Sequence, residues 1–316
     1  MKKRTIIALI VAGVLIIAGG MLTVLGLSFA GDSMQKSERI RQEITIQEGF
    51  GNIAIDTADC DVKFAMFSGR SDCMVEVYSY ENVKHTAVVE NGTLKIKMID
   101  ERNWTDHISI GRTESMEMTV YLPVAEYESL QIRTTTGDIA LAQEPVFLET
   151  LLRTNTGDIV CVGVSSDALD CMTSTGDISL QNSSPNMLKL QSNTGDFKVS
   201  TVAGDEIHMM TNTGELDAEV VNALTVTCKT ETGDVELEKV LAEDYLQIRT
   251  DTGDVGIENC DAGRVDIETE TGDVSGHFLT PKWFSAFSDT GNVTVPNTPD
   301  GGECRIQTDT GDIHFK

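Results

Sequence analysis

The sequence predicts an all-β protein, a right-handed parallel β-solenoid with coils of 19–20 residues, preceded by one N-terminal transmembrane helix. From residue 130 onward one unit, apolar-x-apolar-x-Thr-x-Thr-Gly-Asp-(Ile/Val)-x-apolar, recurs ten times with few departures. Such a fixed period is typical of repeat proteins, in which each unit buries its apolar face against its neighbours. The Thr-Gly pairs begin at Thr136, Thr156, Thr175, Thr194, Thr213, Thr232, Thr252, Thr271, Thr290 and Thr310.

Alternation within the unit predicts two short strands joined at a corner. The residue four before the second threonine is apolar in every unit, whereas positions between hold charged residues such as Arg133 and Lys229. This is the pattern of a strand with one buried face. After the glycine the buried parity changes, which places a corner there. Because both threonines share the buried parity, we expect internal ladders of hydroxyl groups rather than an exposed ice-binding face.

The N-terminus has the pattern of a membrane anchor. Residues 1–5 include three bases, and residues 6–30 carry no charge. A helix over 6–30 rises about 37 Å, more than the ~30 Å hydrocarbon core. The positive-inside rule then predicts a cytoplasmic tip at 1–5, a single transmembrane helix at 6–30, and an extracellular remainder at the bacterial cell membrane. A cleaved signal peptide is the alternative, because Ser28-Phe29-Ala30 has the small-x-small form.

Three segments follow the anchor. Residues 31–41 are polar and are expected to form a stalk linker, and residues 122–316 hold the ten coils. Between them, residues 42–121 are strand-like but irregular, which indicates a β-rich capping region with antiparallel hairpins that close one end of the rod. Within it, residues 53–64 reproduce the repeat with Asp59 for threonine and Cys60 for glycine. We interpret this stretch as a degenerate first coil.

The seven cysteines are predicted to be core residues. They are odd in number, and those beyond Cys73 stand where other units have Leu, Ile or Val. Small core hydrophobes are the expected role, with a Cys60–Cys73 disulfide as the alternative in an oxidising exterior.

Charge excludes one class of function. The chain has 24 bases and 50 acids, a net charge of −26, and every acid lies at or beyond Asp32. A nucleic-acid binder is excluded, because binding DNA or RNA depends on neutralising phosphates. A polyanion attracts cations and cationic peptides. The expected partners are therefore the membrane and an envelope component, protein or cationic peptide.

Two acidic columns flank the corner in the C-terminal half. An acid follows the glycine in nine of ten units, and a second acid precedes the threonine in the last five. For the first column, turn chemistry is the expected role, because a short side-chain oxygen caps backbone amides. Carboxylates stacked about 5 Å apart also suggest a calcium-binding hypothesis. Its ligands are Glu231, Asp234, Asp251, Asp254, Glu270, Asp273, Asp309 and Asp312.

The scarce aromatics gather in FLTPKWFSAF, residues 278–287. Phe284 has core parity. Either the segment packs over the final coils, or Phe278, Trp283 and Phe287 form a small exposed binding patch for a glycan or protein.

No catalytic constellation is visible, and no cofactor is expected. The five histidines fall in different columns, and the acids follow the repeat instead of breaking it as an enzymatic site would. We therefore expect a non-enzyme, with a carbohydrate-active β-helix enzyme as a remote alternative. The last unit runs to Lys316 with no capping helix, so we expect its open end to be covered by the chain's own loops or by end-to-end association with a second molecule.

The run MTVYLPVAEYESLQIRTTTGDI, residues 118–139, and the Thr-Gly-Asp series after it resemble the bacterial putative-adhesin β-strand-repeat family. These domains of unknown function are similar to LiaG-like proteins of cell-envelope stress systems, and the resemblance covers residues 42–316. It implies an outward-facing β-solenoid anchored by one helix. The expected function is that of a non-enzymatic surface module, an adhesin or envelope-stress-associated binding protein; a purely structural spacer is the alternative.

Overall fold

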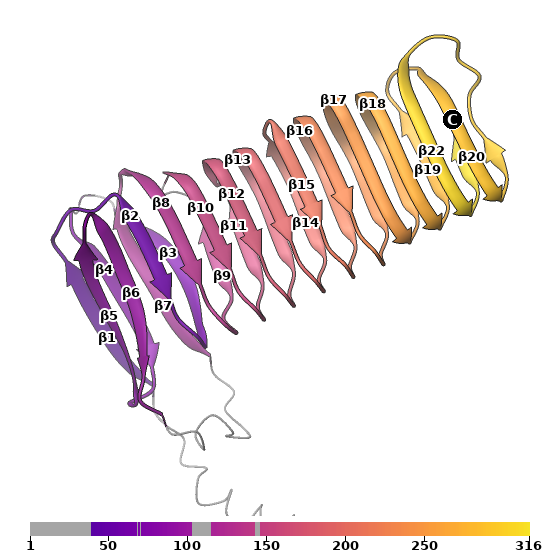
Figure 1. Ribbon diagram of the computed structural model, residues 1–316. Coiled ribbons are helices and arrows are strands. Elements are labelled where there is room, and N and C mark those ends of the chain that lie inside the picture. The colour runs from indigo at the N-terminus through magenta and orange to yellow at the C-terminus, as the bar shows by residue number, and fades with distance from the viewer. Residues whose placement is uncertain (1–38, 68, 70, 103–114, 143–145) are drawn as a thin grey trace, which may run out of the picture.

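The computed structural model describes residues 39–67, 69, 71–102, 115–142 and 146–316, which form a rod built only of strands and loops (Figure 1). The predicted cytoplasmic tip, the transmembrane helix at 6–30 and most of the stalk lie outside the described residues. Within the described part of the chain, no helix is long and apolar enough to cross a membrane. The strands are β1 (Ile40–Ile46), β2 (Asn52–Asp56), β3 (Cys60–Phe67), β4 (Cys73–Ser79), β5 (Val83–Glu90), β6 (Thr93–Asp100), β7 (Met116–Pro123), β8 (Glu126–Arg133), β9 (Ile139–Ala142), β10 (Val146–Arg153), β11 (Ile159–Val162), β12 (Ser165–Met172), β13 (Ile178–Gln191), β14 (Phe197–Ala203), β15 (Glu206–Met210), β16 (Leu216–Lys229), β17 (Val235–Thr252), β18 (Val255–Thr271), β19 (Val274–Phe278), β20 (Lys282–Thr290), β21 (Val293–Thr294), β22 (Gly302–Thr310) and β23 (Ile313–Phe315).

Each coil contributes one strand segment to each of two parallel ladders. β8, β10 and β12 pair in one ladder, and β9, β11 and β13 pair in the other, with every residue opposite its equivalent in the neighbouring coil. The long strands β16, β17 and β18 run from one ladder into the other. Apolar side chains from both ladders fill a single continuous core. The predicted parallel β-solenoid is therefore confirmed.

Glycine is required at the corner because the backbones of adjacent coils touch there. At Gly214 the φ angle is 150°, and an added Cβ would lie 2.1 Å from the carbonyl oxygen of Gly195. No other residue fits that contact. In the first coil, Cys60 takes the place of glycine, and an added Cβ on Gly137 would lie 2.0 Å from the Cys60 oxygen. The alignment of residues 53–64 as a degenerate coil is thereby confirmed.

Only the first threonine of the motif is internal. Its hydroxyl is buried in most coils and donates to the glycine carbonyl of the neighbouring coil, as from Thr154 to Gly137 at 3.1 Å. The second threonine, expected inside as well, is exposed in every coil. The chain begins to turn between the two, so the alternation of a strand no longer applies. The internal residues are Thr134, Thr154, Thr173, Ser192, Thr211, Thr230, Thr250, Thr269, Ser288 and Thr308.

The capping region closes the N-terminal end with antiparallel pairs, as predicted. β5 pairs antiparallel with β6, while β4 pairs antiparallel with both β1 and β7. The degenerate coil is not outermost, however. β6 and β7 pair in parallel with β2 and β3 on the outer side, and β8 and β9 pair with them on the inner side. The first coil in sequence is thus enclosed between later segments.

The coils at the other end do not stack in sequence order, in contrast to the expected succession of ten. β22 pairs with β18 on one side and with β20 on the other, and β23 likewise lies between β19 and β21. The unit of Thr310 therefore lies between the units of Thr271 and Thr290 (Figure 1). The last coil in the sequence is therefore covered by the preceding coil, which itself forms the open end, and end-to-end association with a second molecule stays a prediction.

All seven cysteines are buried and unpaired, including Cys60 and Cys73. Burial raises the pKa of Cys228 to about 12, so its thiol stays protonated and unreactive. The predicted role as small core residues is confirmed, and the alternative disulfide does not form.

Candidate functional site

The acids that follow the corner glycines bind the backbone of the next coil. The amide of Asp158 donates to Oδ1 of Asp138 at 2.9 Å, and the amide of Asp177 donates to Oδ1 of Asp158 at 2.8 Å. The same bond recurs along the rod and begins at Asp61 in the degenerate coil. We call these residues the corner column. The predicted capping role is confirmed for Asp61, Asp138, Asp158, Asp177, Asp196, Asp234, Asp254, Asp273 and Asp312. Glu215 and Asn292 also stand in the column, where their backbone amides donate to Asp196 and Asp312.

A second acidic column stands beside the first on the C-terminal coils. Its side chains are exposed and make no backbone bond equivalent to that of the corner column among the described residues. In spatial order, this flanking column consists of Glu231, Asp251, Glu270, Asp309 and Asp289.

Because β22 is inserted beside β18, each of the two acidic columns continues without a gap from the unit of Thr271 to the unit of Thr310. Thr310 pairs with Thr271, and the amide of Asp312 donates to Oδ1 of Asp273 at 2.7 Å. The eight carboxylates of the calcium hypothesis therefore lie on four successive coils, although the unit of Thr290 separates them in the sequence. No Lys, Arg or His of the described chain lies within salt-bridge distance of any of the eight.

These carboxylates do not form a recognisable metal centre. Among the described residues, no group of three or more His, Cys, Asp or Glu side chains is arranged to hold a metal ion. The Oδ1 atoms of Asp234, Asp254 and Asp273 already accept backbone amides. Calcium binding thus remains a hypothesis, and the arrangement is that of a line of negative charge instead of a ligand cage.

The field beside the corner is negative enough to affect a neighbour. The pKa of Glu236 is raised, first by burial and then by repulsion from Asp234, Asp217 and Asp254. Its carboxylate lies over Gly256, where an added Cβ would be 2.1 Å from Oε2. Negative potential therefore extends from the corner onto the adjacent strand face.

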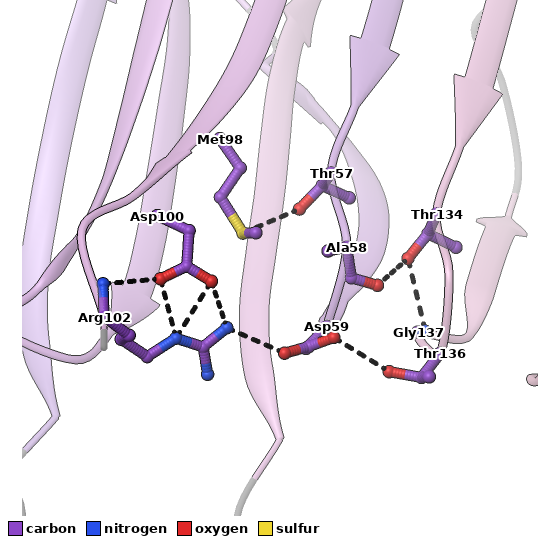
Figure 2. A network of polar contacts seen from close by, with 9 residues as sticks. All are labelled: Thr57, Ala58, Asp59, Met98, Asp100, Arg102, Thr134, Thr136 and Gly137. Carbon is purple, nitrogen blue, oxygen red and sulfur yellow. Dashed lines mark hydrogen bonds and ion pairs between the residues drawn. The ribbon is translucent and has the colours of Figure 1, made fainter. Parts of the chain in front are cut away.

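An arginine ends the column of exposed threonines at its N-terminal side (Figure 2). The guanidinium of Arg102 bonds both oxygens of Asp100 and donates to Oδ2 of Asp59 at 2.8 Å. Asp59, in the place of threonine, also accepts from the Thr136 hydroxyl at 3.4 Å. The buried guanidinium lies beside Asp59, where a preceding coil would otherwise place its own exposed threonine. Nothing in the local sequence marks Arg102 for this contact, because it follows an irregular strand.

Trp283 and Phe287 are exposed, but Phe278 is not. Their relative exposures are 52% and 57%, against 7% for Phe278. The Phe278 ring stacks on the Phe315 ring with 5.3 Å between their centroids, and the Phe284 ring packs against Phe315 with 5.5 Å between centroids. The interpretation of Phe278 as part of a binding patch is wrong, because it ends its strand with its side chain in the core. Phe284 has the predicted core parity.

A groove of about 600 Å³ lies on the edge opposite the acid columns, over small residues such as Ala223, Ala242 and Gly302. The ammonium group of Lys282 is buried beneath it and bonds the carboxylate of Asp261, the Ala262 carbonyl at 2.7 Å and the Thr280 hydroxyl at 3.1 Å. All three ammonium protons are thus used. Sequence analysis missed this cluster, although the repeat alignment contains a signal for it. Lys282 stands at a position of core parity, eight residues before its threonine, where the two neighbouring units have Gly263 and Gly302.

The comparisons with known proteins agree with this architecture. The Toastrack family, DUF4097, matches residues 50–220 and 205–316. The chain belongs to this family. The Toastrack match spans nearly all of the rod, and the resemblance to adhesin-like β-repeat proteins is confirmed. A search of curated proteins finds no match.

Solved structures similar to this Toastrack chain are distant from it. A putative adhesin from Bacteroides fragilis shares 11% identity over 89% of this chain and 98% of its own, with a TM-score of 0.46. A putative lipid binding protein from Parabacteroides distasonis shares 17% identity over 76% and 95%, with a TM-score of 0.44. A putative adhesin from Parabacteroides merdae shares 12% identity over 78% and 98%, with a TM-score of 0.33.

Proposed function

We propose that this Toastrack chain is a non-enzymatic binding protein of the bacterial cell envelope. Its N-terminal segment holds it at the membrane with the rod outside, and its acidic corner edge binds polycations such as cationic peptides or basic segments of envelope proteins. One observation carries the proposal: eight carboxylates lie on four successive coils, and no cation of the described chain lies within salt-bridge distance of them.

The scaffold favours binding over simple spacing. Backbone bonds from one coil to the next fix the corner column, as between Asp254 and Asp273 at 2.8 Å. Coils rise about 4.8 Å each, so the carboxylates form a regular row whose mutual repulsion a bound polycation would relieve. A spacer has no need of a second acidic column confined to one half of the rod.

The test measures binding of a fluorescent deca-lysine peptide to the full chain in detergent at low and high salt. Removing charge from the flanking column, by Glu231→Gln, Asp251→Asn, Glu270→Gln and Asp309→Asn together, leaves the backbone-capping acids intact. We expect affinity to fall about tenfold or more at low salt, and wild-type affinity to fall steeply as salt rises.

A matched control removes four exposed acids away from the corner, by Glu126→Gln, Glu149→Gln, Glu219→Gln and Glu258→Gln. We expect the affinity of this variant to change by less than about threefold. An equal loss in both variants would show that net charge alone attracts the peptide and would overturn the site. No binding at low salt would favour the spacer function.

A further inference from the structure

The rod ends in β20, which is paired on one side only. β22 lies on its inner side, and no other described strand pairs on its outer side. Side chains alternate along it: Phe284 and Ala286 pack against the core, whereas Trp283, Ser285 and Phe287 are exposed. The open end of the solenoid is therefore an edge strand with two large aromatic rings beside it.

The orientation of the backbone identifies the groups left without a partner strand. The Thr230 amide donates to the Arg249 carbonyl of the next coil at 2.9 Å, and by the same pairing the carbonyl of Phe287, the residue equivalent to Arg249, faces β22. Backbone groups alternate in direction along a strand. Those of Phe284 and Ala286 therefore point away from the rod. The Thr298 hydroxyl contacts the Lys282 carbonyl on this outer side, so the free edge begins after Lys282.

Charge allows a second copy to approach here. Residues 274–299 include one acid, Asp289, and one base, Lys282, in a chain of net charge −26. Elsewhere two rods repel each other, because the acid columns run along their length. The neutral end is the place where two copies meet with the least electrostatic cost.

The two ends of the rod differ in how they protect their edges. At the N-terminal end, β1 exposes Arg41 and Glu43, and β5 exposes Lys84. Charged residues on an edge strand oppose pairing with other chains. Among the side chains that β20 exposes from Trp283 to Phe287, none is charged. The C-terminal end lacks the protection that the N-terminal end has.

We propose that β20 pairs antiparallel with β20 of a second copy, about a two-fold axis at Ser285. Trp283 and Phe287 are equidistant from Ser285, so each Trp283 lies opposite the partner's Phe287, and the free backbone groups of both strands meet. A two-fold axis makes the contact self-complementary and closes it at a dimer. Two cross-strand aromatic pairs form on the outer face, while Phe284 of each copy extends the core toward the partner's Ala286.

The geometry has a consequence that rests on the proposed membrane anchor. The N-terminal cap and β20 lie at opposite ends of the rod (Figure 1). Two rods joined at β20 therefore place their N-terminal ends at the far ends of a double-length assembly. Such a pair suits contact between two facing membranes, which is a homophilic mode of adhesion. The pairing itself does not depend on where the chain is anchored or on whether the corner edge binds polycations.

Disulfide crosslinking of the full chain in detergent tests the register. A cysteine introduced by Ser285→Cys lies opposite itself across the axis at a non-hydrogen-bonded position, where antiparallel strands place Cα atoms about 4.5 Å apart, within the reach of a disulfide. The seven native cysteines are buried. We expect covalent dimers under mild oxidation, and few from the exposed control Ser165→Cys. Equal crosslinking at both positions would reveal crowding in micelles and would overturn the proposal.

Charge variants test the pairing by sedimentation. Trp283→Glu with Phe287→Glu brings like charges opposite each other, so we expect monomers. Trp283→Lys with Phe287→Glu brings opposite charges together at the same two positions, so we expect the dimer to return. Both pairs of substitutions alter only exposed side chains, and melting temperatures near that of wild type check the fold. A wild-type monomer at tens of micromolar, or open chains longer than dimers, would overturn the two-fold contact.

Discussion

The amide of Asp312 donates to Oδ1 of Asp273 at 2.7 Å, although 39 residues separate them. From Asp138 to Asp273 the bonded partners are 19 or 20 residues apart, and only the bond from Asp138 to Asp61 of the degenerate coil spans more. The separation between Asp312 and Asp273 arises because the unit of Asp312 is inserted between two units that precede it in the chain. The consequences of this insertion, and of the corner contacts generally, can be tested by substitution.

Deletion of residues 302–316 should expose the preceding coil to protease. β20 pairs only with β22 among the described strands, so removing β22 takes away its ladder partner. We expect residues 282–301 to be cleaved far faster than in the full chain, while residues up to 278 stay protected. Limited proteolysis with mass spectrometry measures this. Continued protection of 282–294 would mean that β20 can stack directly on β18.

The corner carboxylates should act as hydrogen-bond acceptors more than as charges. Oδ1 of Asp254 accepts the Asp273 amide at 2.8 Å, and an asparagine side chain offers a carbonyl oxygen at the same distance from the backbone. We expect Asp254→Ala to lower the free energy of unfolding by about 1–2 kcal/mol, because a backbone amide loses its partner. Asp254→Asn should change it by less than about 0.5 kcal/mol. Urea unfolding followed by circular dichroism distinguishes the two; equal losses would assign the effect to charge.

Gly214→Ala should be severely destabilising, in contrast to Gly256→Ala. An added Cβ at Gly214 meets the Gly195 carbonyl oxygen at 2.1 Å with φ at 150°, so backbone must move. The cost should exceed about 3 kcal/mol. At Gly256 the contact is the mobile carboxylate of Glu236, also at 2.1 Å, which can swing aside. We expect a melting temperature close to wild type for Gly256→Ala. Similar melting temperatures for the two variants would contradict the close approach of backbones at the corner.

Acidification should loosen the N-terminal cap through His85. Burial lowers the pKa of His85 to about 4, and neither ring nitrogen has a partner in the described structure. The unfolded chain takes up a proton near pH 6.5 and the folded chain only near pH 4, so stability is present above pH 6.5 and is lost as pH falls toward 4. The full loss is about 3 kcal/mol.

The control is His85→Leu, which removes the titrating group and keeps the site apolar. Melting temperatures at pH 7.5 and pH 5 should differ less in this variant than in wild type. Hydrogen exchange locates the change, which is expected in β1, β5 and β6. An unchanged difference between the two pH values would assign the acid sensitivity to other groups.

Calcium should stabilise the rod no more than matched ionic strength does. The Oδ1 atoms of Asp234 and Asp254 already accept backbone amides, and the carboxylates of the flanking column form a line along the rod instead of a cage around one point. Screening of repulsion is therefore the expected effect, and sodium chloride should reproduce it. Thermal melts in 5 mM calcium and in sodium chloride of equal ionic strength make the comparison. A rise specific to calcium that Glu231→Gln and Glu270→Gln abolish would support the calcium hypothesis.

Local patterns in the sequence predict the coil well, because its chemistry is local. The corner at glycine, the capping by Asp138 and the degenerate coil at Cys60 follow from alternation and turn chemistry within about twenty residues. The exposure of Thr136 was missed because alternation ends where the chain bends. Phe278 was misplaced for a related reason, since it lies at the end of β19, where the motif no longer determines direction.

Stacking order is a different kind of information. Every unit presents the same internal threonine and the same corner glycine to its neighbours, so the motif fits Thr290 beside Thr271 as well as Thr310 beside Thr271. Only contacts outside the motif distinguish the two orders. Gly302 leaves room beside Gly263, and Lys282 reaches Asp261 from the far side of the inserted strand. Such contacts carry no periodic signal, and neither does the contact of Arg102 with Asp59.

The position of β22 also sets the order of events during folding. Residues 302–315 leave the ribosome after both of the coils that enclose them, so the rod cannot be completed by adding one coil after another from the N-terminus. Residues 282–294 must either wait without a ladder partner or separate again to admit the strand. Closure of this end is therefore expected to be the slowest step of folding. A chain that lacks β22 would expose the unpaired edges of both β18 and β20.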